Sequence, residues 1–278
     1  MLREEWHITG AKGTVLFLRE WKPETEAAKA VVGLVHGMGE HGDRYAHVAA
    51  RFTEAGIAVI ALDQHGHGRS SGKRGHLHSI GAAASDAALM IEAAAERHPG
   101  APIFLYGHSM GGNVALNCAL RLHPDVKGLI LTSPWLRLAF KPNPAVEWFG
   151  RRLASIMPAL QQKTGLNPAD LFRPGFVPAD SLTADKLCHT KITLQAFKEI
   201  SSGGEWALAN ADRLQIPLLL MHGTSDRVTS LEASRLLAGK LGGKCDFRRW
   251  DGGYHELHND IEGEKTIQEL IIWLEEQL

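Results

Sequence analysis

The stretch APIFLYGHSMGGNVALNCAL, residues 101–120, places one serine between an apolar run and a helix-like segment. IFLY is typical of a buried strand, and NVALNCAL follows the serine with the composition of a helix. Gly107, Gly111 and Gly112 surround Ser109, and glycine is favoured where a tight turn is crowded because it has no Cβ. This order of segments predicts a sharp turn that lifts the hydroxyl of Ser109 away from a sheet.

A second stretch, GRSSG at 68–72, matches the same G-x-S-x-G pattern with Ser70 in the central place. Ser70 follows QHGHGR and precedes SGKRGHLH, so neither a strand nor a helix adjoins it. A nucleophilic serine of this type needs the strand-to-helix turn, because the helix N-terminus favours developing negative charge. We therefore predict that Ser109 is the nucleophile and that Ser70 is an ordinary turn residue.

Five near-continuous apolar runs predict the sheet around this turn. Strands that are buried on both faces have this pattern, which is typical of a parallel sheet covered by helices. The runs are AVVGLVHG (30–37), IAVIALD (57–63), APIFLYG (101–107), VKGLILTS (126–133) and IPLLLMHG (216–223). EWHITG and TVLFLREW predict a hairpin before them.

Helical periodicity lies between the runs. We expect helices at about 80–98, 110–123, 230–240 and 261–277, and another over 43–56, which Asp43 would cap and Gly56 would end. Alternating strands and helices predict an α/β fold with a mostly parallel central sheet and helices on both faces.

Residues 137–206 interrupt this alternation and predict a helical cap, or lid, inserted into a core of residues 1–136 and 207–278. Six of the twelve prolines lie between residues 142 and 178. An apolar stripe recurs at helical spacing, formed by Val146, Phe149, Leu153, Ile156 and Leu160. Two interpretations remain open: the stripe packs the insertion onto the core, or it meets a membrane, a micelle or an acyl chain.

The bulk composition narrows the class of protein. The 278 residues carry 30 Lys and Arg against 31 Asp and Glu, so a formal net charge of −1 gives no reason to expect a nucleic-acid partner. The three cysteines fit neither a disulfide framework nor a cysteine-based zinc site. Charged residues interrupt the N-terminal MLREEWHITG, and we expect a soluble, cytoplasmic protein, at most peripheral to a membrane, whose oligomeric state stays open.

A nucleophilic serine needs a base, and the base needs a third group that orients it. Asp226 directly follows the apolar run 216–223, at the sheet edge where the serine is expected. His255 lies in DGGYHELHND, after the strand-like CDFRRW (245–250), with His258 as its local rival. We favour Asp226 as the acid and His255 as the base; the alternative for Asp226 is a turn cap before the helix at 230.

Two backbone amides are needed to stabilise the oxyanion that forms during acyl transfer. One comes from the residue after the nucleophile, here Met110. The other comes from the loop after an early strand, here HGMGEHGDRY (36–45), in which Met38 is the natural donor. The same stretch is also consistent with an ordinary glycine-rich connection.

Taken together, these motifs resemble the α/β-hydrolase fold, and specifically its monoacylglycerol lipase and lysophospholipase branch. The resemblance runs from about residue 31 to 260. It rests on HGMGEHGDRY, LDQHGHGRSSGKRGH, YGHSMGG, SPW (133–135), HGTSDRVTS and YHELHND.

The resemblance implies a serine esterase that cleaves the acyl ester of a monoacylglycerol or a similar small lipid, without metal or cofactor. It implies that the acyl chain lies under the lid and that Arg44 and His258 are near the glycerol-binding end. Lysophospholipids and other small esters, including phenolic esters, are alternative substrates because residues 137–206 carry no matching motif.

Two other classes of protein compete with this prediction. The fifteen histidines include two H-x-H pairs, His65 with His67 and His76 with His78, but no H-E-x-x-H motif supports a metal hydrolase. A non-enzymatic binding protein with the hydrolase shell would lack part of the Ser-His-Asp set, and here every member is present in order.

Overall fold

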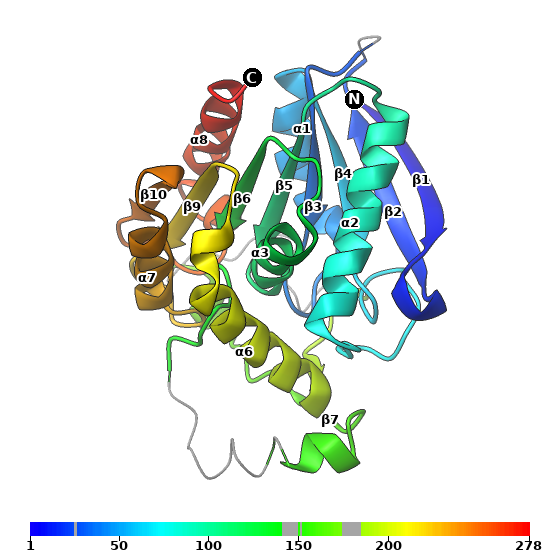
Figure 1. Ribbon diagram of the computed structural model, residues 1–278, viewed down its shortest axis with the longest axis vertical. Helices are drawn as coiled ribbons and strands as arrows, with labels where there is room; N and C mark the ends of the chain where they lie inside the picture. The colour runs from blue at the N-terminus through cyan, green and yellow to red at the C-terminus, as the bar shows by residue number, and fades with distance from the viewer. Residues whose placement is uncertain (25–26, 141–149, 151, 174–184) are drawn as a thin grey trace.

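An eight-stranded sheet forms the centre of the protein, in the order β1-β2-β4-β3-β5-β6-β9-β10 (Figure 1). The computed structural model describes residues 1–24, 27–140, 150, 152–173 and 185–278. The strands are β1 (Leu2–Thr9), β2 (Val15–Lys22), β3 (Ala30–Val35), β4 (Ile57–Asp63), β5 (Ile103–His108), β6 (Gly128–Thr132), β9 (Leu218–Gly223) and β10 (Cys245–Trp250).

The pairing of the strands confirms a mostly parallel sheet. β1 and β2 form the predicted antiparallel hairpin, and β2 is also antiparallel to β4. From β4 through β3, β5, β6 and β9 to β10 every neighbouring pair is parallel. The carboxyl ends of these parallel strands therefore lie at one edge of the sheet, where loops can bring functional groups together.

Helices cover both faces of the sheet (Figure 1). They are α1 (Ala46–Glu54), α2 (Ile80–Arg97), α3 (Met110–Leu122), α6 (Leu194–Ala209), α7 (Leu231–Leu241) and α8 (Gly263–Glu275), with a short α5 (Pro168–Leu171) in the insertion. Short 3-10 turns occur at Ala11–Gly13, Gly42–Tyr45, Ala211–Arg213, Gly242–Lys244 and Leu257–Asn259.

Two apolar clusters hold these layers together. Along β5, Leu105 packs in the cluster formed with α2, α3, α6 and α7, whereas Phe104 and Tyr106 pack in the cluster formed with α1 and α8. Side chains alternate between the two faces of a strand, and every residue of β5 is buried because both of its faces are covered. The predicted α/β architecture is thus confirmed, and its physical reason is burial on both sides.

The start of α1 corrects one prediction. Asp43 does not cap this helix, which begins at Ala46 after the 3-10 turn Gly42–Tyr45 and has no side-chain cap. The Asp43 carboxylate instead lies 3.1 Å from Arg3 and 3.8 Å from Arg19, so charge pairing with β1 and β2 takes the place of capping. Gly56 follows the helix with a φ of +83°, as its predicted role in ending the helix requires.

The described part of the insertion contains a second, two-stranded sheet and parts of helices. β7 (Gln161–Lys163) pairs antiparallel with β8 (Lys191–Thr193). Of the predicted apolar stripe, Val146 and Phe149 lie outside the described residues, whereas Ile156 is 79% and Leu160 is 40% exposed. Packing onto the core does not account for these two exposed side chains.

Helix α6 joins the insertion to the core. The Asn113 side chain, from α3, donates hydrogen bonds to the carbonyls of Trp135 (2.7 Å) and Ile200 (2.8 Å), and it is fully buried. Gly204 of α6 lies so close to Leu136 that a Cβ would come within 2.1 Å of its carbonyl oxygen. The predicted boundary between residues 206 and 207 therefore falls inside a helix that packs on the core.

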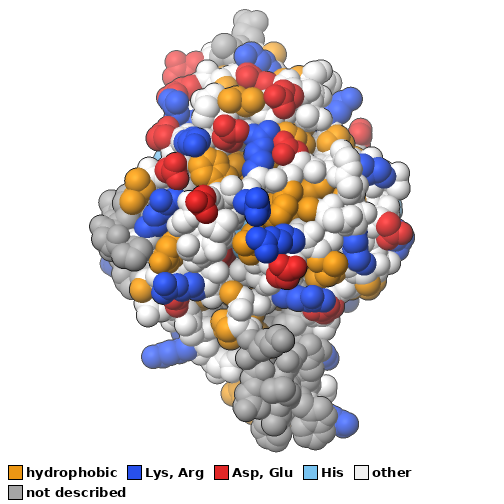
Figure 2. Space-filling model, turned by 90° about the vertical axis from the view of Figure 1, so that its left-hand side faces the viewer, with side chains coloured by type: hydrophobic (Ala, Val, Ile, Leu, Met, Phe, Trp, Pro, Cys, Tyr) orange, Lys and Arg blue, Asp and Glu red, His pale blue; other side chains and the backbone are white. Residues whose placement is uncertain are grey.

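The distribution of charged side chains on the surface agrees with the near-equal numbers of basic and acidic residues. Basic and acidic side chains are interspersed across the face in Figure 2. In the part of the chain that the structure describes, no helix is both long and apolar enough to cross a membrane.

Candidate active site

Ser109 occupies the turn between β5 and α3 with a backbone conformation that L-residues rarely adopt. Its φ is +53° and its ψ is −118°. Such a residue persists only where its surroundings hold it. Here its N–H donates to the Thr132 carbonyl (3.0 Å), and its carbonyl accepts from Trp135 N–H (2.8 Å). The predicted sharp turn is therefore present, and β6 with the loop after it fixes its geometry.

Two glycines permit this turn. A Cβ on Gly111 would lie 2.0 Å from the Val35 carbonyl oxygen, and a Cβ on Gly107 would lie 2.4 Å from the Gly111 carbonyl oxygen. Backbone atoms at these distances cannot move aside as a flexible side chain can. The predicted crowding thus arises from the packing of α3 against the end of β3 and against β5.

Ser109, His255 and Asp226 form a hydrogen-bonded chain. His255 Nε2 lies 3.0 Å from Ser109 Oγ, and His255 Nδ1 lies 2.9 Å from Asp226 Oδ2. Ser109 is 5% and His255 is 3% exposed, and the Asp226 side chain is fully buried. The three predicted residues come from the ends of β5, β9 and β10, which the parallel sheet places at one edge.

The surroundings of Asp226 fix both its charge and its orientation. Its carboxylate accepts hydrogen bonds from Val228 N–H (2.8 Å), Thr229 N–H (3.0 Å) and the Thr229 hydroxyl (2.8 Å). Burial opposes ionisation, yet His255 and the nearby His222 hold the pKa of Asp226 well below its usual value. An ionised Asp226 accepts the Nδ1–H of His255, which leaves Nε2 free to accept a proton from Ser109.

Asp226 also changes the pKa of the base. Burial lowers the pKa of His255, but the adjacent Asp226 carboxylate more than compensates and raises this pKa above its usual value. The neighbouring His108 behaves oppositely, because burial and the nearby His255 lower its pKa to about 4. A neutral His108 beside His255 adds no further positive charge to the site.

The loop after β3 places Met38 beside Ser109. Glu40 holds this loop, since its carboxylate accepts from Gly37 N–H and from the Tyr45 hydroxyl (2.9 Å). Met38 and Ser109 line the same cavity. Met110 is the first residue of α3, and the N–H of such a residue has no acceptor within its helix. Both residues predicted to supply oxyanion donors therefore adjoin Ser109.

Arg44 and His258, which were expected near glycerol, are both buried. Arg44 bridges Glu40 (2.5 Å) and Glu256 (2.9 Å), and with Ser109 it lines a small void of about 20 Å³. His258 is 2% exposed and stacks on Tyr45 with ring centroids 4.7 Å apart, and it is not among the residues that line this void.

Sequence reasoning missed Glu40 and Glu256, which together neutralise Arg44. One available signal was the i, i+4 spacing of Glu40 and Arg44. Glu256 follows the predicted base directly, but nothing in the local sequence joins it to a residue 212 positions earlier.

An apolar cavity of about 350 Å³ opens beside Ser109. Its apolar lining comes from both the core and the insertion: Met38, Trp135, Leu138, Phe140, Leu166, Ile192, Leu194, Phe197 and Val228. A larger hollow of about 950 Å³ is lined by Ala11, Ala88 and Leu122, among others, and does not include Ser109. The smaller cavity is thus the one that opens onto Ser109, the predicted nucleophile.

Ser70, the serine of the second G-x-S-x-G match, has a structural role. Its hydroxyl donates to the Asp63 carbonyl at the end of β4 and accepts from Phe17 N–H of β2 at 2.8 Å. The hydroxyl therefore joins two strands and is used in hydrogen bonds to the backbone.

Comparisons with known proteins agree with this geometry. Residues 26–262 match the family described as serine aminopeptidase, S33. The chain is 30% identical to a monoacylglycerol lipase from Mycolicibacterium smegmatis, covering 98% of this chain and 97% of that protein. It is 35% identical to an uncharacterized abhydrolase domain-containing protein from Dictyostelium discoideum, of which it spans only 29%.

A solved structure of a monoacylglycerol lipase is also similar to this protein over nearly the whole chain. The crystal structure of Paleococcus ferrophilus monoacylglycerol lipase superposes with a TM-score of 0.83 at 30% identity, covering 95% of this chain and 99% of that one. The chain therefore belongs to the α/β-hydrolase family described as serine aminopeptidase S33, as a serine hydrolase of the branch that resembles monoacylglycerol lipases.

Proposed function

We propose that this protein hydrolyses the acyl ester of monoacylglycerols to glycerol and a free fatty acid, through an acyl-enzyme on Ser109. The observation that carries the proposal is the hydrogen-bonded chain from Asp226 through His255 to Ser109, which ends at an apolar cavity of about 350 Å³. The similarity to monoacylglycerol lipases over nearly the whole chain supports the same substrate class.

In the first step, His255 Nε2 takes the proton of Ser109 as Oγ attacks the ester carbonyl. The distance of 3.0 Å between these atoms is suited to direct proton transfer. The ionised Asp226 stabilises the resulting imidazolium and keeps its orientation. The amides of Met38 and Met110 would stabilise the negative oxygen of the tetrahedral intermediate.

In the second step, the protonated His255 gives its proton to the departing glycerol oxygen, leaving the acyl group on Ser109. Water then attacks this ester as His255 takes its proton, and His255 returns that proton to Ser109 Oγ as the fatty acid leaves. Every proton moves between His255 and oxygen atoms, so the proposed reaction needs no cofactor.

The two spaces around Ser109 differ in polarity, which suits a lipid with a small polar alcohol. The acyl chain would lie in the larger cavity beside Leu138 and Phe197. The void of about 20 Å³ is lined by Arg44, Glu40 and Glu256 and has room for about one water molecule, so the glycerol would lie at its mouth. Contact of glycerol with Arg44 and His258 stays a prediction.

Access to lipid would come through the cap. Four apolar side chains of its described part are exposed: Phe140 (57%), Ile156 (79%), Met157 (49%) and Leu160 (40%). We propose transient contact of these side chains with a membrane or micelle, because apolar side chains gain by leaving water.

Substitution of the nucleophile, together with a panel of esters, tests the proposed activity. Wild type should prefer medium or long monoacylglycerols over lysophospholipids, short p-nitrophenyl esters and hydroxycinnamoyl esters. Ser109→Ala should lower kcat on the order of 10⁴-fold or more, because no other group can form the acyl-enzyme. Steady-state kinetics with purified protein measures both effects.

The control for this variant is Ser70→Ala, which removes a buried hydroxyl from the other G-x-S-x-G match and should retain turnover. Substantial activity of Ser109→Ala would refute the catalytic assignment. A clear preference for lysophospholipids or phenolic esters would leave the proposed mechanism intact but would show that the proposed substrate is wrong.

The pH dependence of hydrolysis should report the base. His255 accepts a proton only when neutral, and Asp226 raises its pKa above the usual 6.5. We therefore expect kcat/KM to fall as pH decreases through an inflection above 6.5, because the protonated ring cannot take the Ser109 proton. A profile measured on a soluble ester checks this, and an inflection well below 6.5 would contradict it.

A bulkier side chain in the cavity beside Ser109 should slow the hydrolysis of esters with long acyl chains. Leu138→Trp should lower kcat/KM about 10-fold or more for a long-chain monoacylglycerol, since losing the burial of two methylenes costs about 1.6 kcal/mol. A short p-nitrophenyl ester should be little affected. Leu236→Trp on α7, where the leucine is 40% exposed and outside the cavity lining, is the matched control. An equal loss for both esters would show that the acyl chain lies elsewhere.

A further inference from the structure

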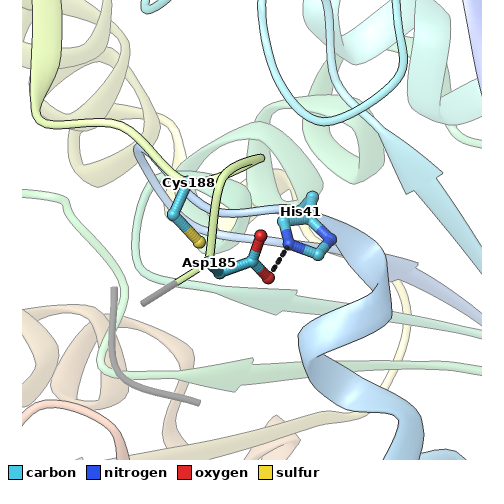
Figure 3. A group of neighbouring side chains, drawn as sticks. All are labelled: His41, Asp185 and Cys188. Atoms are coloured by element: carbon cyan, nitrogen blue, oxygen red, sulfur yellow. Dashed lines mark hydrogen bonds and ion pairs between the residues drawn. The ribbon is translucent and has the colours of Figure 1, made fainter. Parts of the chain in front are cut away.

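Three potential metal-ligating side chains meet outside the catalytic chain: His41, Asp185 and Cys188 (Figure 3). Their donor atoms all lie within 4.8 Å of one another. His41 Nε2 lies 2.7 Å from Asp185 Oδ2, and Cys188 is drawn on the other side of the same carboxylate. Nitrogen, oxygen and sulfur donors thus lie close together, with the carboxylate between the other two.

The three residues come from two segments that backbone contacts hold together. His41 lies in the loop after β3 that carries Met38, whereas Asp185 and Cys188 precede β8 in the insertion. The next residue, His189, donates its N–H to the Gly39 carbonyl at 2.8 Å. A ligand shared by His41 and Cys188 would therefore join the insertion to the loop beside the nucleophile.

The charges around the group favour a cation. Arg44 is close to Cys188, but Glu40 and Glu256 already neutralise it. Asp185 adds a third carboxylate, which lies 2.7 Å from the His41 ring and accepts the Leu187 N–H at 2.8 Å. Three carboxylates thus lie around one guanidinium in this part of the protein.

The group is accessible from one side. His41 is 2% exposed, whereas the Asp185 side chain is 27% exposed and Cys188 is half-buried. An ion can therefore reach the donors from solvent while the imidazole stays fixed in the core. The His41 Nε2 atom faces the Asp185 carboxylate, whereas Nδ1 is buried without a hydrogen-bond partner among the described residues.

We propose that His41, Asp185 and Cys188 bind one Zn²⁺ ion, at a site separate from the catalytic triad. Zn²⁺ accepts all three donor types, whereas Mg²⁺ and Ca²⁺ prefer oxygen alone. On binding, Cys188 releases its thiol proton to solvent, and His41 coordinates through Nε2 as a neutral ring that carries its proton on Nδ1. A fourth position is left for water. The ion would brace the insertion against the loop that carries Met38.

Metal titration of the full-length protein tests this site. Competition of the metal-free protein with a chromophoric chelator should show one equivalent of Zn²⁺ bound with a Kd of about 1 µM or tighter. Co²⁺ in place of Zn²⁺ should give the intense near-ultraviolet charge-transfer absorption of a cobalt thiolate. Zn²⁺ should also raise the Tm, because an ion that binds only the folded state stabilises it.

Variants assign the donors. Cys188→Ala and His41→Gln should each weaken Zn²⁺ binding on the order of 100-fold, and Cys188→Ala should abolish the charge-transfer band and the rise in Tm. Cys245→Ala is the matched control, because Cys245 in β10 is likewise half-buried and burial raises the pKa of both thiols to about 12. Circular dichroism without metal checks that each variant folds. If His41→Gln fails to fold, Asp185→Asn replaces it.

Two results would overturn the proposal. One is the absence of saturable Zn²⁺ binding in the wild type. The other is binding that Cys188→Ala leaves unchanged and His78→Gln removes. That outcome would place the ion at the imidazoles of His65, His76 and His78, whose ring centroids lie 4.4 to 6.1 Å apart. Neither result bears on ester hydrolysis, which is measured independently.

Discussion

The rest of the active site depends on the backbone of Ser109, which is held at a φ of +53° between β5 and α3. This backbone conformation costs free energy in a serine, and contacts from the neighbouring residues offset that cost. Thr132 and Trp135 hydrogen-bond to the residue itself, and Gly107 and Gly111 let the backbones approach. The side chain of Asn113, one turn into α3, then ties the same helix to α6 of the insertion. The cavity wall and the nucleophile are thus positioned by one turn.

Buried carboxylates hold the groups that surround this turn. The buried charge of Asp226 is compensated by His255 and by hydrogen bonds from Val228 and Thr229, so the carboxylate stays ionised and orients the His255 ring. Glu40 and Glu256 are compensated by Arg44, and Glu40 in turn binds Gly37 N–H in the loop of Met38. One carboxylate therefore positions His255, the predicted base, and the other two position the loop expected to bind the oxyanion. Each carries a buried charge that needs its partner, because an unpaired one would be strongly destabilising.

Much of this arrangement could be predicted from the sequence because it follows from local pattern. Apolar runs such as IAVIALD indicate strands that are covered on both faces, and the parallel order then brings Ser109, Asp226 and His255 to one edge. Contacts between distant segments could not be predicted in this way. Asp43 pairs with Arg3 and Arg19 instead of capping α1, and Arg44 finds Glu256 across the fold. His41 and Asp185 likewise meet although they are 144 positions apart, so no sequence motif predicts their contact.

The central claim is that Ser109 is an activated nucleophile, and covalent labelling tests it most directly. Intact-protein and peptide mass spectrometry after treatment with a fluorophosphonate should show one adduct per chain, located on Ser109. Labelling should slow strongly in His255→Ala, because the hydroxyl then lacks the base that activates it. No adduct, or an adduct on Ser70 with Ser109 unmodified, would contradict the account.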